Sequence, residues 1–275
     1  MAARNETTLV LGGTGRTGRR VARRLWDRGA LVRVGSRSGT PPFDWDDPGT
    51  WTRVLKGVSS AYVLYYPDLA LRGAATMIHA FTDLAVQSGV RRLVLLSRRG
   101  EDEARLCEEV VQSSGVEWTI VRAAWLCQNF SEGFLREPVR AGEVALPMGN
   151  VGEPFVDADD IADVAASALM EEGHCGRTYE VTGPRLLTFA DAVAEIARAM
   201  RRDIRFVPIP LGEFEAEMAR ERVSADVVEL MTYLFTTVLD GRNAHLCDGV
   251  RRALGRAPRD FADYARNAAT RAWRQ

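Results

Sequence analysis

Residues 7–20 read TTLVLGGTGRTGRR, in which an apolar, β-rich run leads directly into a glycine-rich loop and then into a helical pattern. Glycines at positions 12, 15 and 18 permit the tight turn, the close approach of backbone to a pyrophosphate and the close helix–strand packing of a dinucleotide-binding fold. The helix that begins near Arg16 directs its free N–H groups and its positive dipole end at the same point. The stretch predicts a nucleotide-binding loop, with a purely structural glycine turn as the alternative.

The cofactor that this loop holds is indicated by the end of the second β-rich run, which reads Gly35-Ser36-Arg37-Ser38. Folds specific for NAD usually place Asp or Glu here, where the carboxylate binds the ribose 2′-hydroxyl. Arg37 can instead pair with a 2′-phosphate, helped by Ser36 and Arg16, because guanidinium matches phosphate geometry bidentately. The sequence therefore predicts NADP(H) as cofactor; the alternative for Arg37 is a solvated surface arginine.

Beyond the loop, β-rich runs alternate with helical patterns up to about residue 122, which indicates a parallel sheet with crossover helices. We expect strands at residues 7–11, 31–35, 60–65, 92–96, 117–121, 178–181 and 204–207, with a shorter extended piece at 43–45. A helix is expected over 158–170, and Thr188 with Asp191 predicts a capping box at the start of a helix over 190–200. Three or four further helices follow.

These elements predict an α/β fold, a Rossmann-type doubly wound parallel sheet with a smaller, mostly helical C-terminal substrate lobe. We expect the NADP(H)-binding domain to span residues 1–185, with 130–152 crossing to the substrate lobe. The substrate-binding lobe is expected over residues 186–275.

Composition limits the partners and the location of the chain. The 36 basic and 37 acidic residues give a net charge of -1, which provides no footprint for nucleic acid or an anionic membrane. No apolar window is long enough for a membrane span, and the polar start of the chain, residues 1–6, does not suit a signal peptide, so a cytoplasmic location is expected. Four scattered cysteines argue against a disulfide framework or a zinc site, and no metal is expected.

Three charged or polar segments are each interpreted without a bound ligand or metal. Carboxylates at 157, 159, 160 and 163 are better suited to capping a helix than to binding metal. The charged residues of 98–103 suggest a solvated face at a helix entrance. His174 and Cys175 are expected at the surface, in a glycine-flanked turn.

Five motifs are distributed along the chain: GGTGRTG at 12–18, LLS at 95–97, GVEWTIVR at 115–122, QNF at 128–130 and FVDADDIA at 155–162. Together they resemble the NmrA-like branch of the atypical short-chain dehydrogenases/reductases. The sequence is most similar in kind to bacterial relatives of the festuclavine and agroclavine dehydrogenases of ergot-alkaloid biosynthesis. The resemblance implies an NADPH-dependent reductase of secondary metabolism, although the branch also contains quinone and azo reductases, isoflavone-reductase-like enzymes and dinucleotide-sensing regulators.

The resemblance also implies where ligands bind. The cofactor-binding residues are Gly12, Thr14, Gly15, Arg16, Thr17, Gly18, Ser36, Arg37, Asp44, Trp45, Tyr66, Pro67 and Ser97. Among them, Asp44 and Trp45 lie beside the adenine, where the family more commonly has Gly-Asp. Tyr66, Pro67 and Ser97 lie along the path to the nicotinamide. The substrate is bordered by Trp125, Gln128, Asn129 and Phe130.

The chemistry is restricted by what the chain lacks. Typical short-chain dehydrogenases use a Tyr-x-x-x-Lys pair in which the ammonium lowers the tyrosine pKa. Lys56 is the only lysine, and residues 97–111 contain no tyrosine. An iminium or quinone-like acceptor is already electrophilic, so its reduction needs mainly orientation against the nicotinamide. We assign Ser97 to positioning and Tyr66 to proton donation, with water as another donor and packing as the alternative role for Tyr65 and Tyr66.

The sequence thus predicts an NADPH-dependent reductase that transfers hydride to a small hydrophobic or aromatic acceptor of iminium, quinone or enone type. The alternatives are a non-catalytic NADP(H)-sensing regulator and a redox-neutral isomerase or cyclase that retains NADP(H). The expected partner is a small-molecule substrate, and the chain is expected to be a monomer or homodimer.

Overall fold

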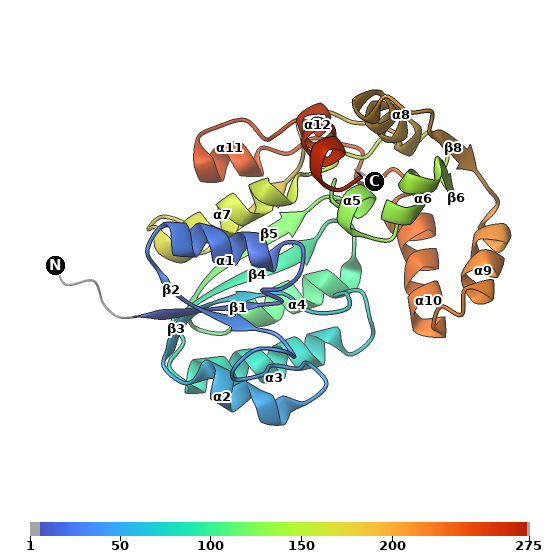
Figure 1. Cartoon of the computed structure of the whole chain (residues 1–275). Coiled ribbons are helices and arrows are strands. Elements are labelled where there is room, and N and C mark those ends of the chain that lie inside the picture. The colour runs from blue at the N-terminus through green and yellow to red at the C-terminus, as the bar shows by residue number, and fades with distance from the viewer. Residues whose placement is uncertain (1–5, 274–275) are drawn as a thin grey trace. The chain divides into compact units, whose positions relative to one another are not determined.

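The computed structural model describes residues 6–273, so most of the polar start of the chain lies outside the described residues. Within this range the chain divides into two compact units, each built from segments that are separate in the sequence (Figure 1). Unit 1 comprises 6–123, 158–181 and 248–256, and unit 2 comprises 124–157, 182–247 and 257–273. No helix in residues 6–273 has the length and apolar character that a membrane crossing requires.

Unit 1 is built on a six-stranded parallel sheet with the order β2-β1-β3-β4-β5-β7. Its strands are β1 (Thr7–Leu11), β2 (Leu31–Gly35), β3 (Val58–Val63), β4 (Arg92–Arg98), β5 (Glu117–Ala123) and β7 (Arg177–Val181). Their order reverses beside β1, which places the crevice for a ligand at the carboxyl ends of the central strands. The sheet confirms the predicted Rossmann-type doubly wound fold.

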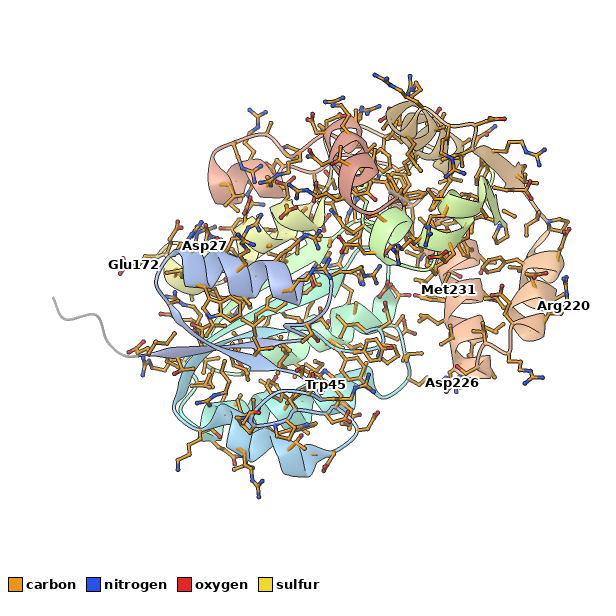
Figure 2. All side chains as sticks on the ribbon, viewed as in Figure 1. Asp27, Trp45, Glu172, Arg220, Asp226 and Met231 are labelled. Atoms are coloured by element: carbon orange, nitrogen blue, oxygen red, sulfur yellow. The ribbon has the colours of Figure 1, made fainter. Side chains whose placement is uncertain are left out.

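Helices cover both faces of this sheet, which explains why its strands are nearly continuous apolar runs. On one face lie α1 (Gly18–Asp27), α7 (Ala158–Met170) and α11 (Gly249–Leu254) (Figure 1). On the other lie η1 (Pro48–Thr50), α2 (Trp51–Leu55), α3 (Ala74–Gln87) and α4 (Asp102–Gln112). The core between α2–α4 and the sheet contains Phe43, Trp45, Trp51 and Phe81, which meet mostly edge to face. Trp45 is labelled in Figure 2.

Unit 2 is mostly helical and contains a two-stranded parallel sheet of β6 (Glu143–Leu146) and β8 (Arg205–Pro208). Its helices are α5 (Asn129–Glu132), α6 (Arg136–Ala141), α8 (Phe189–Met200), α9 (Leu211–Arg220), α10 (Ala225–Tyr233), the π-helical η2 (Leu234–Val238) and α12 (Phe261–Arg271). Phe130, Phe155, Phe189 and Phe261 form the centre of its core. The predicted capping box is confirmed, because Thr188 and Asp191 exchange hydrogen bonds at the start of α8.

The structure also differs from the sequence expectations in specific places. The extended piece at 43–45 is not a strand: Asp44 forms only an isolated bridge to Asp47, because Phe43 and Trp45 insert into the aromatic core. Residues 130–152 contain α5, α6 and β6 in place of a simple surface crossing. Strand β6 was not predicted, because its partner β8 lies far along the chain and periodicity alone does not reveal it.

The two units do not follow a single boundary at 185/186. Residues 124–157 belong to unit 2, and 248–256 return to unit 1 as α11 and its flanks. The return is close, since a Cβ at Gly249 would lie 2.1 Å from the carbonyl oxygen of Glu180 in β7. The ligand-binding roles assigned to the two parts stay predictions.

Candidate functional site: a dinucleotide cradle at the sheet edge

The glycine-rich loop at the carboxyl end of β1 is a backbone cradle that tolerates no side chains at its contacts. Gly12 has φ +62°, and its N–H donates to the Gly35 carbonyl at 2.9 Å. A Cβ at Gly18 would lie 2.3 Å from the Gly12 carbonyl oxygen, and one at Gly13 would lie 2.7 Å from a Val34 methyl. The glycines therefore let the start of α1 pack directly on the loop, as the sequence predicted.

The exposed tip of this loop presents backbone donors. Thr14 and Gly15 are exposed, and the Gly15 N–H closes the turn onto the Gly12 carbonyl at 2.8 Å. Among residues 6–273, neither Thr14 nor Thr17 donates its backbone N–H to another group. The Thr17 hydroxyl is buried beside the Tyr62 phenol. Free N–H groups at the start of a ten-residue helix form an anion-binding site, so the cradle fits the pyrophosphate of a dinucleotide.

Arg37 follows β2 and lies next to this cradle in the fold, because β2 is paired in register with β1. The Arg37 side chain is exposed and makes no hydrogen bond or ion pair within the described part of the chain. Ser36 is half-buried, and its carbonyl accepts the N–H groups of Gly39 and Phe43, which fixes the turn. A free guanidinium on a fixed turn is suited to a 2′-phosphate.

Asp44 and Trp45, which are predicted to lie beside the adenine, both make hydrogen bonds within the protein. Trp45 is 7% exposed, and its indole N–H donates to the Leu64 carbonyl at 3.0 Å. The Asp44 carbonyl accepts from the Trp51 indole at 2.7 Å, while an Asp44 carboxylate oxygen accepts the Asp46 N–H at 3.2 Å. Both residues thus hold the loop after β2 onto the aromatic core. Their contact with adenine stays a prediction.

Tyr66 and Pro67 follow β3, and both side chains are exposed, Tyr66 by 65%. The neighbouring Tyr65 is half-buried and packs edge to face on Trp45, and burial raises the pKa of its phenol. The alternative weighed for this tyrosine pair, one packed and one free, matches their placement. Tyr66 is the member of the pair that offers its hydroxyl to solvent.

Ser97 does not lie on a surface that a ligand reaches. It is 0% exposed, and its hydroxyl donates to Glu108 Oε1 at 2.6 Å. Glu108 also accepts from Arg122 Nε at 2.8 Å, and Arg122 in turn pairs with Glu180. The positioning role predicted for Ser97 therefore needs this hydroxyl to leave its partner.

Ser97, Arg122 and Glu180 lie side by side in register on β4, β5 and β7, and we call them, with Glu108 of α4, the charged row. Arg99 extends the row by an ion pair to Glu180 at 3.5 Å. Sequence reasoning missed this set. The sequence does contain charged residues within otherwise apolar strands. Charged residues are rarely buried unless they are paired, so their positions pointed to buried pairs.

A second feature missed from the sequence is the carboxyl of Glu101. The expected solvated face at 98–103 is wrong for two members, since Arg99 and Glu101 are each 4% exposed. Burial, together with the nearby Asp68 carboxylate, raises the pKa of Glu101 well above its ordinary value, against an opposing effect of Arg98. Charged residues just before a helix can be buried when the preceding strand is a central strand of the sheet.

The predicted substrate segment lies in unit 2, just after β5. Gln128, Asn129 and Phe130 are buried; Phe130 has no exposed surface and packs on Phe155 in the core. Phe130 therefore supports the segment in this structure and offers no surface to a ligand. Gln128 Nε2 donates to Asp157 Oδ1 at 2.8 Å, which anchors the segment to the strand-like run before α7.

Trp125 is the half-buried member of the segment. Its ring contacts Phe134, Phe189 and Phe235, and its indole N–H is buried with no hydrogen-bond partner among residues 6–273. Phe134 is 45% exposed. Trp125 and Phe134 thus form an aromatic surface with an unused donor, which keeps the substrate prediction for Trp125 open.

The acidic residues at the start of α7 are paired with arginines. Asp159 and Asp163 pair with Arg24 of α1, and Asp160 and Asp163 pair with Arg256. The expectation of a surface position for His174 is wrong: it is 7% exposed, its Nδ1 lies 2.8 Å from the Tyr179 hydroxyl, and burial lowers its pKa. The adjacent Cys175 is exposed, as expected.

Comparison with known proteins places the chain in its family. No family model matches the sequence. It is 31% identical to festuclavine synthase II of Penicillium roqueforti, covering 94% of this chain and 97% of that protein. It is 29% identical to an NAD(P)H azoreductase of Xenophilus azovorans, covering 94% and 96% respectively.

Solved structures agree on the fold. The NADPH-dependent quinone oxidoreductase QOR2 of Escherichia coli, crystallised with NADPH, superposes with a TM-score of 0.77 at 18% identity, covering 95% of this chain and 99% of that one. The oxidoreductase fold and the family predicted from the motifs are confirmed. The chain belongs to the NmrA-like branch of the atypical short-chain dehydrogenases/reductases, a family with a Rossmann-type fold.

Proposed function

We propose that this chain is an NADPH-dependent reductase that transfers hydride to a small hydrophobic or aromatic acceptor of iminium, quinone or enone type. The observation that carries the proposal is the open arginine after β2. Arg37 is exposed and unpaired within residues 6–273, and residues 35–38 include no Asp or Glu. A 2′-phosphate would supply the partner that the protein does not.

The residues of the cradle would hold the remainder of the cofactor. Its fit is supported by the contacts at Gly18 and Gly13, which leave room only for backbone, and by the free N–H groups of Thr14 and Thr17. Arg16 and Ser36 would assist Arg37 at the adenosine end. When bound, NADPH supplies the hydride.

The choice of acceptor is supported by where the one lysine of the chain lies relative to the exposed Tyr66. Lys56, the only lysine of the chain, caps the end of α2 just before β3 begins. It therefore lies at the amino edge of the sheet, whereas Tyr66 follows β3 at the carboxyl edge. The chain thus lacks the tyrosine–lysine pair of typical short-chain dehydrogenases, which favours acceptors that are electrophilic without strong protonation.

The relatives support this class of acceptor. One is named a festuclavine synthase and another an NAD(P)H azoreductase, and a third, from Streptomyces griseus, is named as the reductase of an alkanoyl-dihydrofuranone methyl phosphate. Their named substrates are chemically diverse, as expected if the fold mainly orients an already reactive acceptor against the nicotinamide.

The experiment is NADPH oxidation followed by absorbance with a panel of quinones, enones, azo dyes and preformed iminium salts. We expect turnover with at least one conjugated acceptor and a preference for NADPH over NADH. Cofactor affinity is measured separately by calorimetry in the absence of acceptors. Tight NADPH binding with no turnover across the panel would refute the reductase and leave a cofactor-sensing protein.

A further inference from the structure

A carboxyl with one unpartnered oxygen lies buried at the carboxyl edge of the central sheet. Glu101 stands directly before α4, where the chain leaves β4, and is 4% exposed. Its Oε2 atom is buried and has no hydrogen-bond partner among residues 6–273. Burying a carboxylate without a cation to neutralise it costs several kcal/mol, so a buried group of this kind tends to keep its proton.

The neighbours of Glu101 come from two adjacent strands. Asp68 lies in the segment after β3, and Arg98 is the last residue of β4; β3 and β4 are paired in parallel, so both groups reach the same edge. Asp68 Oδ2 lies 3.8 Å from Arg98 Nη2, and Asp68 Oδ1 accepts the Ala70 N–H at 3.1 Å.

Asp68 also lies within hydrogen-bonding reach of Glu101. One arginine thus lies near two carboxyl groups, and Glu103 and Cys107 of α4 are further titratable groups near Glu101. Glu103 adds negative charge, and burial raises the pKa of the Cys107 thiol to about 12, so neither can neutralise a second carboxylate. The arrangement holds one proton between two carboxyls, carried by Glu101.

We propose that Asp68 and Glu101 form a proton store for the reductase, and that this pair supplies the proton taken up when a quinone or enone acceptor is reduced. The inference rests on the proposed function. Asp68 is two residues after Tyr66, whose exposed hydroxyl is the group that would face an acceptor. Glu101 acts through this segment and does not itself touch the acceptor.

The acceptor gains a hydride, with its electron pair, from bound NADPH, and its oxygen takes the Tyr66 hydroxyl proton. The O–H bond of Glu101 breaks as the Tyr66 hydroxyl is restored, which leaves both carboxyls ionised. A proton from water then reloads the pair through Asp68, whose side chain is partly exposed. An iminium acceptor needs no proton, because hydride addition alone yields the amine.

The first test detects the proton directly, without turnover. Infrared spectroscopy of the protein resolves the C=O stretch of a protonated carboxylic acid from the bands of carboxylates and amides. We expect such a band at neutral pH in the wild type and in the control variant Asp102→Asn, which removes the adjacent exposed carboxylate. The band should be absent in Glu101→Gln, and its titration should move to lower pH in Asp68→Asn. Its absence from the wild type at neutral pH overturns the proposal.

The second test separates proton supply from hydride transfer. With a quinone, we expect Glu101→Gln to lower kcat by about 100-fold, the lower range for loss of an acid, with little change in KM. With an iminium salt, kcat should stay near that of the wild type. Equal rates of quinone reduction in Glu101→Gln and the wild type refute the proton store, even if the band is present. Failure of the wild type with every acceptor refutes the reductase, while the infrared band still decides whether the pair holds a proton.

The same pair makes stability depend on pH in a defined direction. Because the pKa of Glu101 is raised in the folded state, its contribution to stability is full below the unfolded pKa of about 4.3 and is lost as pH rises through the folded pKa. Urea unfolding from about pH 5 to about pH 9 should therefore show a steeper alkaline loss in the wild type and Asp102→Asn than in Glu101→Gln. Equal slopes in all three proteins contradict a buried acid.

Discussion

Two regions at the carboxyl edge of the same sheet differ in whether their polar groups have partners within the protein. At the end of β1 and β2, the cradle and Arg37 leave N–H groups and a guanidinium without partners in the described chain. At the ends of β4, β5 and β7, the charged row has its partners within the protein. Arg122 pairs with Glu108 and Glu180, and Ser97 donates a hydrogen bond to Glu108. Thr14, Gly15 and Arg37 of the first region are exposed, whereas Ser97, Glu108 and Arg122 of the second are buried.

This difference separates ligand binding from stability. Polar groups left open beside a helix N-terminus can be satisfied by a ligand, so changes there should alter binding more than folding. Charged groups that are buried and paired have no unused hydrogen-bonding capacity for a ligand. Removing one partner of such a pair leaves the charge of the other uncompensated. The contrast predicts that variants in the two regions differ in which measurement they move.

The largest expected effect is that of Arg122→Met in the charged row. The change leaves Glu108 buried without its cation, because the side chains of Arg122 and Glu108 are only 8% and 3% exposed. We expect the free energy of unfolding in urea to fall by about 3–5 kcal/mol. NADPH affinity of the remaining folded protein should be unchanged.

A matched control removes an exposed arginine from an ion pair. Arg205 and Glu143 pair at 2.6 Å with side chains that are 70% and 47% exposed. Arg205→Met should cost less than about 1 kcal/mol. If the two variants are equally stable, the charged row contributes no more than a surface pair.

The next effect is that of Gly18→Ala in the cradle. Its Cβ would lie 2.3 Å from the Gly12 carbonyl oxygen, so the loop must move away from the helix that points at the phosphates. We expect at least a 100-fold weaker Kd for NADPH by calorimetry, together with a destabilisation of about 1–3 kcal/mol.

Gly212→Ala serves as its control. Gly212 lies within α9, and a Cβ there meets nothing within 4 Å, so the substitution should be neutral or slightly stabilising. NADPH affinity in this variant should match that of the wild type. Unaltered NADPH binding in Gly18→Ala would contradict the assignment of the loop.

The two regions also differ in how well they are predicted from sequence. The cradle was identified because its requirements are local: glycines, a preceding strand and a following helix stand next to one another in the chain. Strands β1 and β2 have the predicted bounds for the same reason. Strand β3 begins two residues before its predicted start, at Val58, since apolar periodicity marks burial and does not mark where pairing begins.

The charged row and the Glu101 carboxyl could not be predicted in this way, because their partners are tertiary. Ser97 was expected near the nicotinamide from its motif, but its burial depends on Glu108 of α4. Phe130 was expected at the substrate from QNF, but the Phe155 and Phe261 rings enclose it in the core. A motif fixes where the backbone passes, whereas the surroundings decide which side chains remain available.

The smallest of the three effects tests the open side of the comparison at a single side chain. Arg37→Ala removes one charge-assisted contact to the 2′-phosphate, which is worth about 1.5–3 kcal/mol, so Kd for NADPH should rise by about 10- to 100-fold. Affinity for NADH, which lacks that phosphate, should be unchanged, and so should stability. Arg53→Ala is the matched control, because Arg53 is also exposed and unpaired within residues 6–273 but lies on α2. If Arg37→Ala weakens both cofactors equally, the arginine contributes only general charge and the selectivity for NADPH must arise elsewhere in the cradle.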